Sequence, residues 1–168
     1  MKPEAIVYTS VSGHTARYAD LLGVKVGLPV YDSREAKAVL ARKTPVIYMG
    51  WLRCGKVVKY KKAAGRYRIL AVCAVGLCPA GEFLREVRYA TVLPDTMPIF
   101  TLQGGIEKEK IRGYTKYLLG KVEKRLKKKE KHNPAERELL DALAQGGDFV
   151  SGEQLSDVMR WYNRSFRQ

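Results

Sequence analysis

Cysteine and histidine are scarce in this sequence, which contains 3 Cys and 2 His among 168 residues. Cys54, Cys73 and Cys78 lack the C-x-x-C spacing of zinc sites and redox motifs, and their odd number argues against a disulfide framework. We therefore expect a protein that binds no metal.

Long apolar runs are also missing. The longest nearly apolar stretch, Ile69 to Ala80, has twelve residues, whereas a helix needs about 20 to span a bilayer. The chain passes from Met1 directly into a strand-like segment. We therefore expect no signal peptide and a cytoplasmic location.

Acidic residues are also few relative to basic ones. The sequence has 31 Lys and Arg against 17 Asp and Glu, a formal net charge of +14. Such an excess favours acidic partners, namely nucleic acids, anionic lipids or acidic proteins. No nucleic-acid-binding motif is present, so we expect no specific nucleic-acid binding. The length and the 46% of hydrophobic residues are typical of one folded domain, 1–168.

Several phosphate-binding and catalytic motifs are absent. The Gly-Lys-Val triplets at 55–57 and 120–122 lack the Ser or Thr of a Walker A loop, and no G-x-G-x-x-G follows a strand. The first loop has no Cys nucleophile of the kind that some phosphatases use. Neither a Ser–His–Asp arrangement nor a carboxylate pair can be placed, so demanding chemistry must come from a cofactor.

Short apolar runs bounded by turn residues indicate strands that are buried on both faces. They lie at 5–8, 46–49, 69–75 and 98–102, with a weaker candidate at 24–30. Helical patterns lie between them, at 14–22, 33–42, 57–64 and 81–89. This alternation predicts an α/β fold with a doubly wound, parallel, five-stranded sheet in a three-layer sandwich.

The composition changes after Ile106. Residues 107–131 contain 11 Lys or Arg and 4 Asp or Glu. Apolar residues at spacings of three and four predict an amphipathic basic helix there. They are Ile111, Tyr114, Leu118, Val122 and Leu126. The basic face suits solvent, an anionic membrane surface or an acidic redox partner, and these alternatives stay open.

The end of the chain carries two further helix signals. Asn133 followed by Pro134 predicts the start of a helix that runs to about 144. The Ser-Gly-Glu-Gln sequence at 151–154 is a capping-box pattern, which predicts a last helix to about 163. Between them, 149–150 is expected to return briefly to the sheet.

The loop after the first strand reads Ser-Val-Ser-Gly-His-Thr at 10–15 and opens a helix. Ligands of open α/β sheets bind beyond the carboxyl ends of the strands, and a helix N-terminus favours phosphate. Ser10, Ser12 and Thr15 can donate hydroxyl hydrogen bonds, and Gly13 permits a close backbone approach. The same residues also suit a plain capping turn.

This pattern resembles the flavodoxin family, whose phosphate loop reads T/S-x-T/S-G-x-T. The order of elements also matches over most of 4–166. The resemblance implies a non-covalently bound FMN, with its phosphate on the first loop and its ring between the loops after the third and fourth strands. The implied residues are Ser10, Val11, Ser12, Gly13, His14, Thr15, Gly50, Trp51, Leu52, Arg53, Val75, Gly76, Leu77 and Cys78. Trp51 is the candidate for stacking on the ring, with Leu52 as the alternative.

Within that family the sequence is most similar to the flavodoxin-type protoporphyrinogen oxidases, in residues 100–106 with the basic helix after them and in 148–150. That branch has a long insertion before its last helix, which corresponds here to a basic helical insertion at about 103–147. Gly104 and Gly105 would let the backbone approach the flavin or would form a turn with positive φ.

The resemblance implies an FMN-binding redox protein that transfers electrons to a partner protein or a quinone. One alternative is a protoporphyrinogen-oxidase-like flavoenzyme that passes electrons to a quinone. Another is a basic interaction module without a cofactor. Cys54 and Cys78 lie in the expected flavin loops, where each is either a thiol of lowered pKa or a small packing residue.

Overall fold

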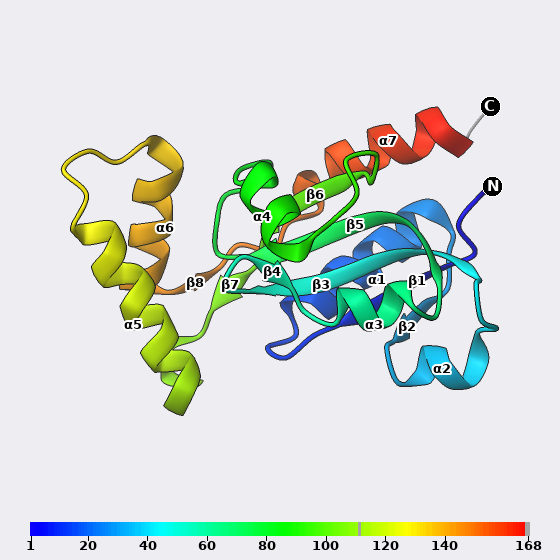
Figure 1. Ribbon diagram of the computed structural model, residues 1–168, viewed down its shortest axis with the longest axis horizontal. Coiled ribbons are helices and arrows are strands. Elements are labelled where there is room, and N and C mark those ends of the chain that lie inside the picture. The colour runs from blue at the N-terminus through cyan, green and yellow to red at the C-terminus, as the bar shows by residue number, and fades with distance from the viewer. Residues whose placement is uncertain (111, 167–168) are drawn as a thin grey trace.

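The computed structural model describes residues 1–110 and 112–166 (Figure 1). Its centre is a sheet of five parallel strands in the order β2-β1-β3-β5-β6, and the short β4 pairs antiparallel with β3. The strands are Ala5–Thr9 (β1), Val30–Asp32 (β2), Pro45–Arg53 (β3), Lys56–Val57 (β4), Arg68–Gly76 (β5) and Ile99–Gln103 (β6). The predicted α/β class with a mostly parallel sheet is confirmed.

Helices cover both faces of the sheet (Figure 1). One face packs against α1 (His14–Val26) and α7 (Ser156–Phe166), and the other against α2 (Glu35–Val39), α3 (Tyr60–Ala64) and α4 (Leu84–Thr91). Along β3, Val46 and Tyr48 face the second group, whereas Ile47 and Met49 face the first. Because both faces are buried, these strands are continuous apolar runs rather than alternating ones.

The segment between β6 and α7 leaves the sheet. It comprises β7 (Gly105–Ile106), a 3-10 turn (Lys108–Lys110), α5 (Gly113–Lys127), α6 (Pro134–Gln145), β8 (Gly147–Asp148) and a second 3-10 turn (Gly152–Leu155). β7 and β8 pair antiparallel, and the α5–α6 hairpin projects from this ribbon (Figure 1). Its small core, built on Ile106, Leu139 and Leu143, packs against Leu77 after β5. No described helix combines the length and apolar character needed to cross a membrane.

Helix boundaries in the first half differ from the prediction. The strand candidate at 24–30 is wrong, because 24–26 continue α1, Gly27 ends that helix with φ 68°, and the strand is Val30–Asp32. Val26 is buried on the same helix stripe as Leu22, which explains the misleading apolar pattern. The helix predicted at 57–64 begins only at Tyr60, and the helix predicted at 33–42 shortens to Glu35–Val39.

In the second half of the chain, one of the two predicted helix caps is confirmed and the other is wrong. Asn133 caps α6 in a reciprocal arrangement with Glu136. The pattern at 151–154 does not close in the same way, because the Gln154 side chain accepts from the Gln103 N–H and donates to the Phe149 carbonyl, each at 2.7 Å. The short return strand is Gly147–Asp148 rather than 149–150, and it pairs with β7. α5 begins at Gly113, and Ile111 and the side chain of Tyr114 lie outside the described residues.

Candidate functional site

Loops at the carboxyl ends of four parallel strands meet around one cavity of about 600 Å³. The walls come from the segments after β1, β3, β5 and β6, and the α5–α6 hairpin forms the outer side. The sequence-predicted residues that line it are Ser12, His14, Thr15, Trp51, Leu52, Val75, Gly76, Leu77, Cys78, Gly104 and Gly105. Segments far apart in the chain therefore converge on a cavity of the size that cofactors occupy.

The loop between β1 and α1 presents unpaired backbone donors at the start of the helix. Gly13 is the N-cap and has φ 91°, a left-handed conformation that glycine adopts without a steric penalty. Its N–H donates to the Ser10 Oγ at 3.1 Å, and the first intrahelical bond runs from the Arg17 N–H to the Gly13 carbonyl. The N–H groups of the three residues between Gly13 and Arg17 therefore have no intrahelical acceptor and suit an anion.

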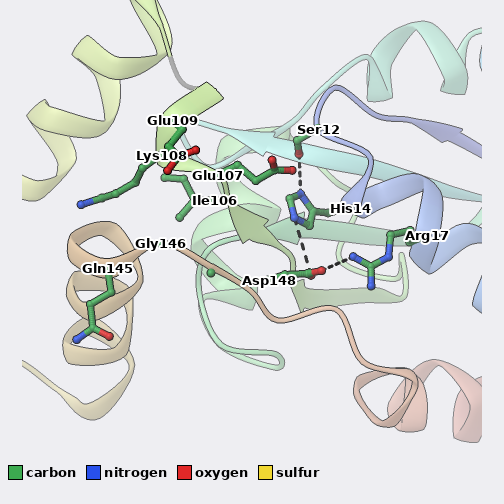
Figure 2. A pocket seen from close by; sticks show the side chains of 11 residues that line it. Ser12, His14, Arg17, Ile106, Glu107, Lys108, Glu109, Gln145, Gly146 and Asp148 are labelled. Carbon is green, nitrogen blue, oxygen red and sulfur yellow. Dashed lines mark hydrogen bonds and ion pairs between the residues drawn. The ribbon is translucent and has the colours of Figure 1, made fainter.

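His14 points into the protein instead of toward solvent (Figure 2). Its Nδ1 lies 2.7 Å from the Ser12 Oγ, and its Nε2 lies 3.9 Å from an Asp148 carboxylate oxygen. Arg17 forms an ion pair with the same carboxylate, and its hydrogen bond holds the pKa of Asp148 below its usual value. Sequence reasoning missed Asp148, because 131 positions separate it from Arg17.

This line of Ser12, His14 and Asp148 differs from a hydrolytic triad. A triad needs a buried carboxylate that hydrogen-bonds the histidine. Here 3.9 Å is too long for a hydrogen bond, 49% of the Asp148 side chain is exposed, and Arg17 already binds the carboxylate. The contacts instead fasten β8 to the first turn of α1, which holds the base of the α5–α6 hairpin against the loop at 10–15.

The glycine pair at the end of β6 approaches protein atoms. A Cβ on Gly104 would lie 2.9 Å from the Val75 Cγ1, and one on Gly105 would lie 2.5 Å from both the Gly147 carbonyl oxygen and the His14 Nε2. Neither glycine has a positive φ, so of the two alternatives for this pair the turn with positive φ is wrong. The pair is needed because β8 and His14 pack directly against this backbone.

The segment predicted as the loop after the third strand is largely strand. β3 continues to Arg53 and returns as β4 through Cys54 and Gly55, whose φ values of 50° and 75° match a tight type I′ hairpin turn. Gly50 lies inside β3 and faces Val57 rather than the cavity. Five predicted residues thus lie outside the cavity lining, namely Ser10, Val11, Gly13, Gly50 and Arg53.

Trp51 and Phe83 are the aromatic side chains among the described residues that line the cavity, and Trp51 also borders an adjoining cavity of about 550 Å³ beside the exposed Val11. Its Nε1 is buried and has no hydrogen-bond partner among the described residues. A buried donor without a partner costs free energy, which a ligand that accepts this hydrogen bond would offset. Leu52 lies over Gly76, where an added Cβ would be 2.8 Å from the leucine Cδ1.

Charged side chains lie on the outer wall. Arg125 of α5 and Lys129, which follows the end of that helix, face the cavity, as do Glu86 of α4 and Glu136 of α6. Lys129 pairs with Glu136, and this hydrogen bond lowers the pKa of the Glu136 carboxyl. The cavity wall therefore carries the Lys129–Glu136 ion pair, one further cation, Arg125, and one further anion, Glu86.

The two cysteines near the cavity are expected to react at different rates. Burial raises the pKa of Cys78 to about 11, with Glu86 and Glu82 adding to the effect, so a lowered pKa is wrong for this thiol. Cys54 is exposed at the hairpin turn, and Cys73 is fully buried in the sheet. Because the thiolate is the nucleophile, iodoacetamide at pH 8 should label Cys54 at least about tenfold faster than Cys78. Peptide mass spectrometry over time measures this ratio, and equal rates would contradict it.

In residues 1–110 and 112–166 no group of three or more His, Cys, Asp or Glu side chains is placed to hold a metal ion. Comparison of the chain with protein-family models, with curated proteins and with solved structures found no match.

Proposed function

We propose that the protein binds one FMN non-covalently and transfers electrons through it, as flavodoxins do. Without β4, the order β2-β1-β3-β5-β6 is the 2-1-3-4-5 arrangement of flavodoxin-like sheets. The observation that carries the proposal is the cavity of about 600 Å³ where the loop at 10–15, Trp51 and the loop after β5 meet.

The residues present fit the chemical parts of FMN. The unpaired N–H groups at the start of α1 and the hydroxyls of Ser12 and Thr15 suit a phosphate. The face of Trp51 suits a flat aromatic ring, and its buried Nε1 lacks a partner among the described residues. When bound, FMN would supply the electron transfer, while the protein binds, orients and shields it.

The electron partner is part of the same proposal. Residues 107–131 carry the local excess of positive charge, and on α5 the side chain of Tyr117 is 57% exposed, with Lys121 above its ring at 4.8 Å. This basic surface adjoins the cavity through Arg125. It suits an acidic redox protein, or an anionic membrane surface that holds a quinone.

A protoporphyrinogen-oxidase-like activity is the alternative, and it depends on the charged residues of the same cavity. A tetrapyrrole substrate carries carboxylates, for which a cation near the flavin is favourable. Arg53, which the flavodoxin resemblance places beside the flavin, does not line the cavity, whereas Arg125 does. A substrate carboxylate would therefore meet α5 rather than the β3–β4 hairpin.

Titration of the purified protein with FMN tests the proposal. We expect binding of one FMN per chain, followed by flavin fluorescence and absorbance. Riboflavin, which has the same ring and no phosphate, is the matched control and should bind at least about tenfold more weakly, because it cannot use the donors at the start of α1. Absence of FMN binding would reject the redox proposal and favour a basic interaction module.

A further inference from the structure

A second pocket is lined by residues of α2 and α3 and of the segments beside them. Figure 1 shows these two helices away from the α5–α6 hairpin. The pocket has a volume of about 200 Å³ and shares no lining residue with the cavity at the carboxyl ends of the strands. We call it the α2–α3 pocket. Its lining residues are Val7, Ser33, Arg34, Lys37, Tyr48, Lys59, Lys62, Ala63, Arg66 and Tyr67.

The two helices beside the pocket are short. α2 and α3 have five residues each, whereas α1 on the opposite face has thirteen. Val7 of β1 and Tyr48 of β3 form the floor, and both residues are fully buried. The Tyr48 hydroxyl donates to the Val58 carbonyl at 2.7 Å, and burial raises its pKa to about 12. The floor is therefore neutral.

All of the charged side chains that line the pocket are basic. Five basic side chains and no acidic one line the pocket, and none of the five forms an ion pair with a carboxylate in the described part of the chain. The nearby acids are already used by the backbone, since Asp32 accepts from the Arg34 N–H and Glu35 accepts from the Asp32 N–H. Converging like charges repel one another, and a bound anion would relieve that repulsion.

Arg66 is held in place before any ligand arrives. Its Nη2 donates to the carbonyls of Lys37 at 2.7 Å and Leu40 at 3.2 Å, and its Nε donates to the Tyr67 hydroxyl at 3.2 Å. These bonds tie the guanidinium to the end of α2 and leave its Nη1 donors for another acceptor. Such preorganised guanidinium groups recognise phosphate oxygens well.

We propose that the α2–α3 pocket binds a small, multiply charged phosphate compound through a diphosphate group. A singly charged anion would leave most of the five cations uncompensated, whereas a diphosphate presents several negative charges in a compact group. The pocket volume of about 200 Å³ equals about seven waters of liquid, enough for one or two phosphoryl groups. The site is independent of the proposed FMN site.

Isothermal titration calorimetry of the protein with inorganic diphosphate, carried out both without FMN and with an excess of FMN, tests this proposal. Binding to the α2–α3 pocket is expected in both titrations, because this pocket shares no lining residue with the cavity proposed for FMN. The Lys37→Gln/Lys59→Gln/Lys62→Gln variant should weaken binding at least about tenfold. The matched control, Lys124→Gln/Lys128→Gln/Lys131→Gln, removes the same charge from the basic segment and should change affinity less than about twofold at 0.15 M salt.

Two further measurements identify the source of the diphosphate and test binding without any variant that could misfold. If ADP binds more tightly than inorganic diphosphate, the ligand is a nucleotide. If ADP binds equally tightly or more weakly, the ligand is free diphosphate or a diphosphate with another substituent. Amide NMR shifts caused by diphosphate should centre on Ser33, Ala63 and Tyr67 in the wild type, which requires no variant. Absence of binding, equal losses in both triple variants, or shifts centred on 10–15 would each overturn the proposal.

Discussion

Replacing Gly50 by alanine is expected to lower the free energy of unfolding by about 1–3 kcal/mol. A Cβ at this position would lie 2.6 Å from the Val57 Cγ1, 3.1 Å from the Val58 carbonyl oxygen and 3.2 Å from the Tyr48 Cε1. The carbonyl cannot yield without cost, because it accepts the buried Tyr48 hydroxyl. The methyl group must therefore push the β4 strand away from β3.

Gly65→Ala is the matched control, because it adds the same methyl group in a permissive setting. Gly65 follows α3 with φ −70° and ψ −19°, and the nearest atoms to an added Cβ are backbone oxygens at 3.5 and 3.7 Å. That variant should be neutral or more stable by about 0.4–1 kcal/mol, since alanine reduces the entropy of the unfolded chain. Urea unfolding followed by circular dichroism compares the two, and equal changes would contradict this account of Gly50.

Gly50 also shows where sequence reasoning failed. The apolar run 46–49 identifies the strand because both of its faces are buried, but the pattern stops at the glycine, so the residues beyond it were predicted as a loop. In the structure the strand continues to Arg53, and the chain reverses at Cys54 and Gly55. Cysteine is not a typical residue at a turn that needs positive φ, so the hairpin left no recognisable signal.

Contacts between segments that lie far apart in the sequence could not be predicted, for a different reason. The start of α1 at His14 agrees with the helical pattern predicted at 14–22, because such a pattern is local, although no side chain caps this helix. The contact of His14 with Asp148 and the joint rim of the α2–α3 pocket depend on how separate elements pack. In the sequence each of those lysines resembles an ordinary solvated side chain, and only the tertiary structure places them around one pocket.

Replacing Thr15 by valine is expected to weaken FMN binding about ten- to a hundredfold. Thr15 is 2% exposed in the first turn of α1, and it lines the cavity. Valine keeps the branched shape and removes the hydroxyl, which would donate to the FMN phosphate. A hydrogen bond to a charged group contributes about 1.5–3 kcal/mol, and each 1.4 kcal/mol is a factor of about ten in affinity. Fluorescence titration with FMN measures the loss.

Two controls separate the phosphate from the ring and from general effects of the substitution. Thr44→Val makes the same change at a residue whose hydroxyl donates to the Ala41 carbonyl at 2.9 Å, outside the cavity, and should leave FMN affinity unchanged. Riboflavin affinity should be equal in the wild type and Thr15→Val, because riboflavin has no phosphate for the hydroxyl to bind. Equal losses for FMN and riboflavin would instead show that the variant disturbs the ring site, and would argue against phosphate binding at the start of α1.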